Sequence, residues 1–315
     1  MILGVDTSCY TTSLALWDHH GRLLCQKRRL LPVAEGQCGL RQSEALFCHI
    51  RQLPELMEEL CREAGPLELR AVAVSARPRP LEGSYMPVFL AGLQLARSLA
   101  ASHGVPCYHT SHQEGHIAAA LWSAGLSWQE DFLALHLSGG TGEILRVRPQ
   151  PAGYAIETIG DCDLPPGQFV DRVGVALGLP FPAGPALERL AGQASCQDFR
   201  LSGSVRGTHI SFSGPEAAAQ RAVKAGTEPG QIAAAVLDNI AKSLAKAIQA
   251  ARQLSGCSQV LLAGGVAANA RIRAKLGPLK LKFAAPEYAG DNAAGVARLG
   301  WQAWSLGKNG DGNHG

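Results

Sequence analysis

The sequence predicts an α/β fold made of two similar lobes. Apolar segments of strand length alternate with helical segments in both halves of the 315 residues. The order of a strand, a small-residue turn, two further strands and then helices occurs twice, which indicates a duplicated architecture. The chain is also 46% hydrophobic and 17% charged, a balance typical of a globular protein with a large core.

The first half opens with three successive strands, after which helices and strands alternate. Strands are expected at residues 2–8, 12–18, 22–30, 69–76 and 105–110. Helices are expected at residues 42–64, 87–103 and 112–122. Pro54 should kink or divide the first helix, because proline removes a backbone donor and clashes with the preceding turn.

The second half repeats this order and is richer in helix. Strands are expected at residues 132–140, 143–149, 153–160, 259–265 and 281–287. Helices are expected at residues 165–178, 185–193, 229–254, 268–276 and 291–306, and the hydroxyl-rich "ISFSG" at 210–214 is consistent with a tight loop.

The periodicity breaks at residues 122–131, which places the boundary between the lobes there. The predicted division is an N-terminal lobe at 1–124 and a C-terminal lobe at 125–306. The polar, glycine-rich stretch at 307–315 is expected to be a flexible tail.

Composition excludes several classes of protein. The net charge of +3 does not by itself indicate nucleic-acid binding, and the basic clusters at 27–29 and 271–275 are typical of solvated faces. Nine scattered cysteines without a CxxC pair argue against a disulfide framework and favour a reducing compartment. No basic and apolar leader and no membrane-length apolar run occur. We therefore expect a cytoplasmic protein with no membrane partner.

Two histidines stand four residues apart in "HQEGHIAAALW". His112 and His116 therefore lie above one another on one helical face and can grip one ion together. A distant carboxylate such as Asp291 could complete the site. The glutamate does not directly follow the first histidine, so this is not the HExxH of metalloproteases. The alternatives are a solvated or core histidine pair, and a helix N-cap role for Asp291.

Three small-residue turns follow apolar strands, at 4–8, 138–142 and 263–265. Such turns can present backbone amides to phosphate oxygens, and Asn269 beyond the third can bond a base or sugar. No Walker A loop and no GxGxxG is present. Each turn alone is also consistent with a simple tight turn.

Two acids stand in the stretch from Gly167 to Leu190. Asp171 lies on a predicted helix and Glu188 one turn into the next, with Gly184 in the proline-rich segment between them. A carboxylate facing a ribose can accept from both hydroxyls. The alternative is a pair of ordinary solvated acids.

In this order, seven motifs of the chain resemble those of the TsaD family of ASKHA-fold proteins, the tRNA threonylcarbamoyladenosine synthases once described as O-sialoglycoprotein endopeptidases. The motifs are "LGVDTSC", "HQEGH", "LSGG", "GQFVDRVGVALGLPFPAGP", "SFSG", "LAGGVAANARIRAKL" and "APEYAGDNAA". The resemblance implies two actin/Hsp70/sugar-kinase-like lobes with a nucleotide and metal cleft between them.

The resemblance also implies the site residues. One divalent ion, iron or zinc, would be held by His112, His116 and Asp291. ATP, AMP or an acyl-adenylate would be held by Ser138, Gly139, Gly140, Asp171, Gly184, Glu188, Gly264, Gly265 and Asn269. The residues expected at the reacting group are Asp6, Ser8 and Thr11. The implied activity moves a threonylcarbamoyl group from an adenylate to an adenosine of tRNA. The implied partners are tRNA, the adenylate, and a paralogous ASKHA subunit or a second copy.

The chain departs from the family pattern at three places. Tyr10 and Thr11 replace an acidic pair, Thr141 replaces a histidine, and Arg77-Pro78-Arg79 replaces Gly-Pro-Gly. Neither Tyr10 nor Thr11 can act as a carboxylate base. A divergent paralogue is therefore expected, acting on tRNA or a related acceptor. The alternatives are a non-catalytic nucleotide-binding partner subunit and a small-molecule kinase of the same fold.

Overall fold

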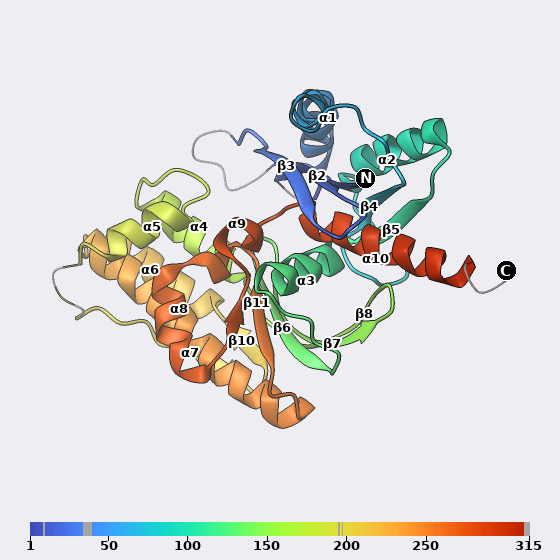
Figure 1. Cartoon of the computed structure of the whole chain (residues 1–315). Helices are drawn as coiled ribbons and strands as arrows, with labels where there is room; N and C mark the ends of the chain where they lie inside the picture. Colours follow the sequence, from blue (N-terminus) through green and yellow to red (C-terminus); the bar gives the residue numbers. More distant parts are fainter. Residues whose placement is uncertain (9, 34–39, 195, 197, 312–315) are drawn as a thin grey trace.

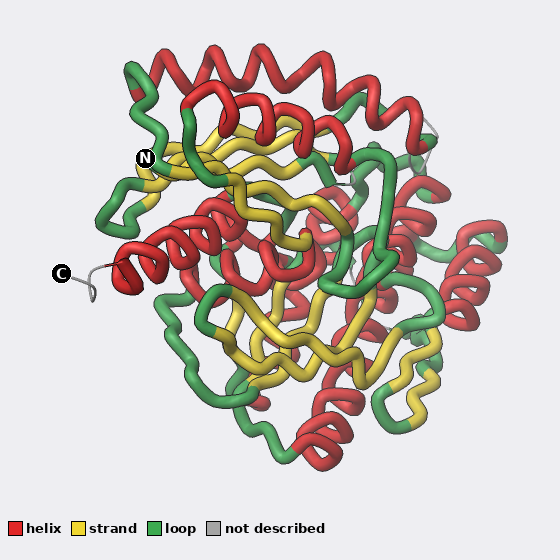
Figure 2. The backbone as a smooth tube through the Cα atoms, turned by 90° about the vertical axis from the view of Figure 1, so that its right-hand side faces the viewer, coloured by secondary structure: helices red, strands yellow, loops and turns green. Residues whose placement is uncertain are grey.

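The computed structural model describes residues 1–8, 10–33, 40–194, 196 and 198–311, so Cys9, Cys38 and residues 312–315 of the predicted tail lie outside the described part. The described chain forms two lobes, each built on a five-stranded sheet (Figure 1). Helices lie outside both sheets and also between them (Figure 2). The predicted α/β architecture is confirmed.

The first sheet has the strand order β3-β2-β1-β4-β5. Its strands are β1 (Ile2–Asp6), β2 (Thr11–Trp17), β3 (Leu23–Leu30), β4 (Ala71–Arg77) and β5 (Cys107–Ser111). The first three form an antiparallel meander, and β4 and β5 continue the sheet parallel to β1. β1 and β2 are buried along their whole length because helices cover both faces of the sheet.

The second sheet repeats this arrangement with the order β12-β11-β6-β7-β8. Its strands are β6 (Phe132–Leu137), β7 (Gly142–Gln150), β8 (Gly153–Asp161), β11 (Val260–Ala263) and β12 (Lys282–Phe283). Again three strands form an antiparallel meander, and two more lie parallel to the first of them. The predicted duplication is therefore a duplication of sheet topology.

Two helices, α1 (Gln42–Ala64) and α2 (Phe89–His103), cover the outer face of the first sheet. The expectation that Pro54 divides the first helix is wrong, because α1 is one continuous helix. Its apolar stripe, which includes Leu53, Leu56 and Leu60, packs into the first core. Burial of that stripe outweighs the single backbone hydrogen bond that proline removes.

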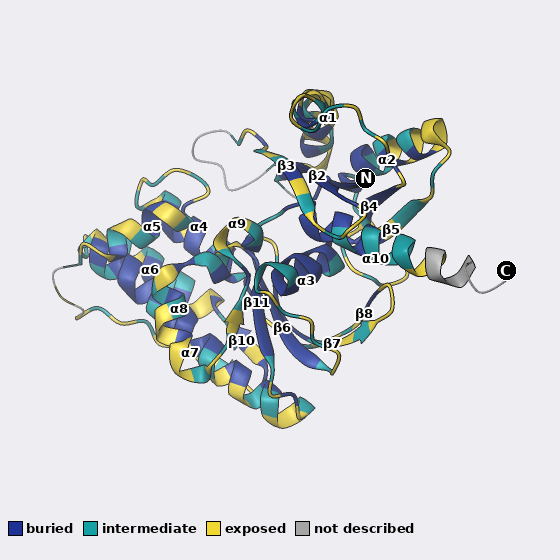
Figure 3. Cartoon of the chain, in the orientation of Figure 1, coloured by how far each residue is buried: buried dark blue, intermediate teal, exposed yellow. Residues whose placement is uncertain are grey.

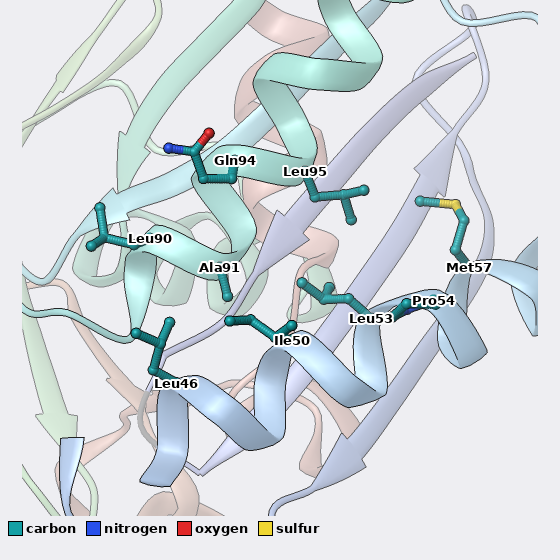
Figure 4. A pocket seen from close by; sticks show the side chains of 9 residues that line it. All are labelled: Leu46, Ile50, Leu53, Pro54, Met57, Leu90, Ala91, Gln94 and Leu95. Atoms are coloured by element: carbon teal, nitrogen blue, oxygen red, sulfur yellow. The ribbon is translucent and has the colours of Figure 1, made fainter. Parts of the chain in front are cut away.

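An apolar groove of about 650 Å³ lies between these two helices (Figure 4). It is lined by Leu46, Ile50, Leu53, Pro54, Met57, Leu90, Ala91, Gln94 and Leu95. None of these residues belongs to the site predicted from the sequence.

The layer between the sheets contains α3 (His112–Ser123) and α10 (Ala294–Asp311). Helix α3 packs Ile117 and Leu121 into the core of the second sheet. Helix α10 comes from the other end of the chain, yet its Ala294 and Ala297 pack against the first sheet. The two helices therefore tie the lobes together. Helix α10 also runs to Asp311, so residues 307–311 differ from the predicted flexible tail.

The contact between α3 and α10 depends on Gly295. A Cβ atom there would lie 2.7 Å from the amide nitrogen of Ala119 and still closer to the carbonyl oxygen of Gly115. Real Cβ atoms do not approach backbone atoms so closely, so only glycine fits at this crossing. Helix α3, which carries both histidines, thus packs backbone to backbone against the start of α10.

The remaining helices belong to the second lobe. They are α4 (Pro166–Ala176), α5 (Gly184–Ala191), α6 (Ser213–Lys224), α7 (Pro229–Ser255), α8 (Ala270–Leu276) and α9 (Pro286–Ala289), with 3₁₀ turns at Gly265–Ala268 and Gly277–Leu279. Helix α7 packs its apolar side inward and exposes the other (Figure 3).

The segment at 210–214 is not the tight loop that was expected. It is the end of β10 (His209–Ser211), which pairs with β9 (Ser204–Arg206), followed by the start of α6. The Asp163 carboxylate accepts hydrogen bonds from the amides of Phe212 and Ser213, which fixes this helix start.

Within the described residues, no helix has both the length and the apolar character needed to cross a membrane.

Candidate metal centre and nucleotide cleft

The predicted site residues follow the carboxyl ends of the parallel strands in both sheets. In the first sheet β1 ends at Asp6, and β5 leads directly into His112. In the second sheet β6 ends before the Gly139 turn, and β11 ends before Gly264. Ligands of open α/β sheets bind at this edge, and here the two edges meet, because the His112 ring after β5 lies 6.1 Å from the His136 ring near the end of β6.

Helix α3 presents both histidines from its first turns. The Ser111 hydroxyl accepts from the amide of Glu114, and the Glu114 carboxylate accepts from the Ser111 amide, which forms a capping box. This cap fixes where the helix begins. His112 and His116 then stand one turn apart on the same face and are both buried.

The structure brings the three predicted metal ligands together. The Nε2 atoms of His112 and His116 are 3.0 Å apart, and they lie 3.5 and 3.2 Å from Oδ1 of Asp291. A tetrahedral ion with bonds of about 2.0–2.1 Å separates its ligand atoms by about 3.3–3.4 Å. The three measured separations bracket that value, so these side chains fit one ion.

Asp291 is not the helix N-cap. The side chain of the next residue, Asn292, accepts from the amide of Ala294 at the start of α10. The Asp291 carboxylate is therefore available to face the two histidines.

A third histidine, His136, completes a cluster that was not predicted. One ligand atom from each of His112, His116 and His136 lies within 4.8 Å of the others. Both ring nitrogens of His136 are buried without a hydrogen-bond partner, as is Nδ1 of His116. Orphaned buried nitrogens are costly unless another group binds them. The cluster therefore fits a metal ion through nitrogen donors as well as through Asp291.

Neighbouring charges and burial shift the pKa values of the cluster in opposite directions. Burial alone would lower the pKa of His112, but Asp6 and Asp291 raise this pKa to about 10. Burial, followed by the adjacent His112, lowers the pKa of His116. Burial lowers the pKa of His136 well below its usual range. Burial would raise the pKa of Asp291, but the histidines hold it below its usual range. The two carboxylates therefore favour the protonated form of His112, whereas burial favours the neutral form of His116 and His136.

Asp6 orients His112 from behind. Its Oδ2 atom lies 3.3 Å from Nδ1 of His112 and accepts from the Ser8 hydroxyl at 2.8 Å, while Oδ1 accepts from the Ser75 hydroxyl. Asp6 and Ser8 are both fully buried. A carboxylate that accepts from Nδ1–H leaves Nε2 free to bind a metal. Asp6 and Ser8, which were predicted at the reacting group, thus lie on the Nδ1 side of His112. Thr11 is the first residue of β2, and its backbone amide donates to the Ser8 carbonyl.

Glu143 fixes the start of α3 to the second lobe. It lies opposite His136 in the β6–β7 pair, accepts from the Gln113 amide group at 2.7 Å and pairs with Arg79 at 2.5 Å. Burial raises the pKa of Glu143, and Arg79 and Gln113 oppose that shift. None of these three residues was predicted from the sequence.

The predicted nucleotide residues gather in two groups. In the first, Asp171 is buried and accepts from the Ala183 amide at 2.7 Å, just before Gly184 begins α5. A Cβ on Gly139 would lie 3.8 Å from the Asp171 carboxylate, so this turn faces the acid. Burial raises the pKa of Asp171, and the Ala183 amide partly offsets the shift.

In the second group, Glu188 joins α5 to the start of α8. Its carboxylate accepts from the side chain of Asn269 at 3.0 Å and from the Ala270 amide at 2.9 Å. Asn269 in turn caps α8 by accepting from the Ile272 amide. The two predicted ligands of the ribose or base therefore lie side by side.

The two glycine turns are fixed by local hydrogen bonds and by close backbone packing. The Ser138 hydroxyl accepts from the amides of Gly140 and Thr141, which closes the first turn. Gly264 has φ of +93°, and a Cβ there would collide with the backbone of Leu137, the last residue of β6. The second turn therefore packs directly against the strand end that leads into the first turn. Gly265 has open space beside it, where a ligand can approach.

Four of the six cations in the basic clusters at 27–29 and 271–275 pair with acids, while Arg28 and Arg273 donate to backbone carbonyls. Lys27 pairs with Glu63, and Arg29 pairs with Glu55 and Glu59. In the second cluster, Arg271 and Lys275 both pair with Asp238. These pairs agree with the interpretation of solvated faces.

Two lobes of duplicated topology, with candidate ligands at the facing ends of their central strands, define an ASKHA-type protein. Solved structures agree. Component A of (R)-2-hydroxyglutaryl-CoA dehydratase from Acidaminococcus fermentans has a TM-score of 0.60 at 14% identity, covering 96% of this chain and 98% of that one. Full-length HypF in its phosphate- and nucleotide-bound form has a TM-score of 0.59 at 15% identity, covering 97% and 55%. At such identities these likenesses show the fold alone.

The sequence comparisons identify the family. The model for TsaD, tRNA N6-adenosine threonylcarbamoyltransferase, matches residues 37–298. The chain is 32% identical to a tRNA N6-adenosine threonylcarbamoyltransferase of Methanopyrus kandleri, covering 95% of this chain and 86% of that protein. It is also 32% identical to a probable bifunctional tRNA threonylcarbamoyladenosine biosynthesis protein of Methanothermobacter thermautotrophicus, of which it spans about half (55%). The chain belongs to the TsaD family.

Proposed function

We propose that this chain is a metal-dependent transferase that moves a threonylcarbamoyl group from an adenylate to an adenosine of tRNA. Membership of the TsaD family supports the tRNA threonylcarbamoyltransferase activity. The observation that carries the metal-dependent form is the convergence of His112, His116 and Asp291 within 3.5 Å of one another. The family match favours this activity over a small-molecule kinase or a non-catalytic subunit.

The metal site would be formed by His112, His116 and Asp291, with His136 as a fourth donor. Imidazole and carboxylate ligands suit iron or zinc. When bound, such an ion would polarise the carbonyl of the transferred group as a Lewis acid. With a metal bound, Asp6 would accept from Nδ1–H of His112 and leave Nε2 to the ion, and Glu143 would hold the start of α3 through Gln113.

The nucleotide part of the donor would lie on the second lobe. Asp171 and Glu188 would accept from ribose hydroxyls, and Asn269, which donates to Glu188, would bond the base or sugar. The glycine turns at 138–140 and 264–265 would present backbone amides to the phosphate. The exocyclic amine of adenine is a weak nucleophile, so positioning the donor beside it and stabilising developing charge would supply most of the catalysis.

The replacement of the acidic pair by Tyr10 and Thr11 should affect the rate of threonylcarbamoyl transfer. Tyr10 packs edge-on against Phe181, with ring centroids 5.9 Å apart, so it joins the two lobes at this edge. A phenol at this place cannot take up a proton from the amine at neutral pH as a carboxylate can. We expect slower transfer than in relatives that keep the acids.

The test is direct. Purified protein, loaded with zinc or ferrous iron, is incubated with threonylcarbamoyl-adenylate and unmodified tRNA, and the nucleosides are analysed by mass spectrometry. We expect threonylcarbamoyladenosine with the wild type and none with His116→Ala, whereas an exposed control such as His103→Ala should keep full activity. Absence of the modified nucleoside at every metal loading would refute the proposed transfer.

A further inference from the structure

The loop between β4 and α2, residues 78–88, is fixed at the metal centre at both of its ends. At one end the Pro78 carbonyl accepts from the Gln113 amide, one residue from His112. At the other end the Val88 carbonyl accepts from the Thr7 hydroxyl, and the Phe89 ring packs edge-on against His112. Both ends of the loop therefore lie beside the candidate metal centre.

The loop is also joined to the second lobe and closed on itself. Arg79 pairs with Glu143 of β7 across the lobes. Within the loop, the Arg79 amide donates to the Ser84 hydroxyl, and the Ser84 amide donates to the Leu81 carbonyl. These hydrogen bonds hold the loop in one shape before any ligand arrives, which reduces the entropic cost of binding.

The side chains that this ordered loop exposes are of an unusual kind. Tyr85 is 63% exposed and Leu81 is 52% exposed. Arg77, the last residue of β4, is exposed and makes no ion pair with any described residue. Arg79 keeps 49% of its side chain exposed, although Glu143 already orients it. Two cations, the acid Glu82 and an aromatic ring are thus exposed on one segment whose ends are fixed at the candidate metal centre.

This combination matches the chemistry that recognises single-stranded nucleic acid. Unpaired bases stack on aromatic rings, and guanidinium groups contact the backbone phosphates. Four cations of the two basic clusters, Lys27, Arg29, Arg271 and Lys275, are paired with acids, whereas Arg77 makes no ion pair with any described residue. An adenosine that reacts at its exocyclic amine must also come from an unpaired loop, because pairing would occupy that amine.

We propose that residues 77–88 bind the single-stranded loop of the acceptor RNA, with Tyr85 as the stacking surface for a base and Arg77 and Arg79 as phosphate contacts. The inference rests on the proposed function for the identity of the acceptor. It adds which surface of the chain receives that acceptor.

The test measures binding without chemistry. A fluorescently labelled RNA stem-loop with an unpaired adenosine-containing loop is titrated with the full chain, and anisotropy gives Kd at several salt concentrations. Tyr85→Ala should raise Kd roughly tenfold or more, while Tyr85→Phe, which keeps the ring, should stay near the wild type. Arg77→Ala should weaken binding and reduce the salt slope by about one.

Arg97→Ala is the matched control. Arg97 is exposed on α2 near Cys107, the first residue of β5, whereas the metal centre follows the last residue of that strand. It should bind RNA as the wild type does. Equal Kd values for the wild type, Tyr85→Ala and Arg77→Ala would overturn the inference and leave the proposed function standing. If the wild type itself does not bind the RNA, the acceptor in the proposed function is wrong and the inference fails with it.

Discussion

Replacing Gly295 by alanine tests whether the seat of α3 on α10 controls the metal centre. The new Cβ would lie 2.7 Å from the Ala119 amide nitrogen and closer still to the Gly115 carbonyl. Ordinary contacts are about 3.5 Å, so Ala119 alone requires the helices to separate by roughly 0.8 Å, and Gly115 requires more. That displacement would move His116 away from Asp291, which precedes α10.

Two measurements follow from this change. Overpacking of this kind costs about 1–3 kcal/mol, so the urea midpoint of Gly295→Ala should fall. The Kd for zinc, measured by competition with a chromophoric chelator, should rise roughly 10- to 100-fold, as for other changes that displace metal ligands. Both effects have one cause, because moving α3 away from α10 strains the packing between them and also increases the distances between the two histidines and Asp291.

Gly307→Ala is the control, since it lies on the same helix with open space around it. This variant should bind zinc normally and be equally or slightly more stable, because alanine favours helix over glycine. If Gly295→Ala matched Gly307→Ala in both urea midpoint and zinc affinity, the helix crossing would not set the ligand geometry.

Three further predictions concern the metal centre. His136→Leu should raise the zinc Kd at least tenfold and yet stabilise the metal-free protein by about 1–3 kcal/mol, because it removes two orphaned buried nitrogens; unchanged zinc affinity in calorimetry would show that His136 is not a ligand. Asp6→Asn should raise the zinc Kd roughly 10- to 100-fold, while Asp131→Asn on the surface should not. The pKa of His112 is raised from 6.5 to about 10, so its contribution to stability is complete below pH 6.5 and is lost as the pH rises towards 10. Urea unfolding of the metal-free protein should show this decline, and a flat profile between these pH values would contradict the pairing of His112 with Asp6 and Asp291.

Local sequence patterns predicted the duplicated topology because strand burial and turn composition are short-range properties. The helical pair His112 and His116 was accessible for the same reason, since i and i+4 spacing fixes the relative placement of two side chains. Asp291 was a candidate from its residue type and from the family resemblance, but the sequence left a helix N-cap role open, which the structure gives to Asn292.

His136 could not be assigned from its surroundings in the sequence. A lone histidine in the buried strand "FLALHLSGG" reads as a core residue. Its place beside His116 depends on how β6 faces α3 across the lobes, which no local pattern encodes. The sequence signal was its position just before a glycine-rich turn, at the strand end where ligands bind. Glu143 was missed for the same reason, because its partners come from two other segments.

The packing of α10 under the first sheet has a consequence for biosynthesis. Ile2, Trp17 and Ala71 lie in a cluster completed by Ala294 and Ala297, which are translated nearly three hundred residues after the first strand. Until those later residues leave the ribosome, this face of the first lobe stays exposed on the nascent chain. The first lobe is therefore completed only after the second lobe has been translated, and chaperone binding to it should persist until α10 has been made.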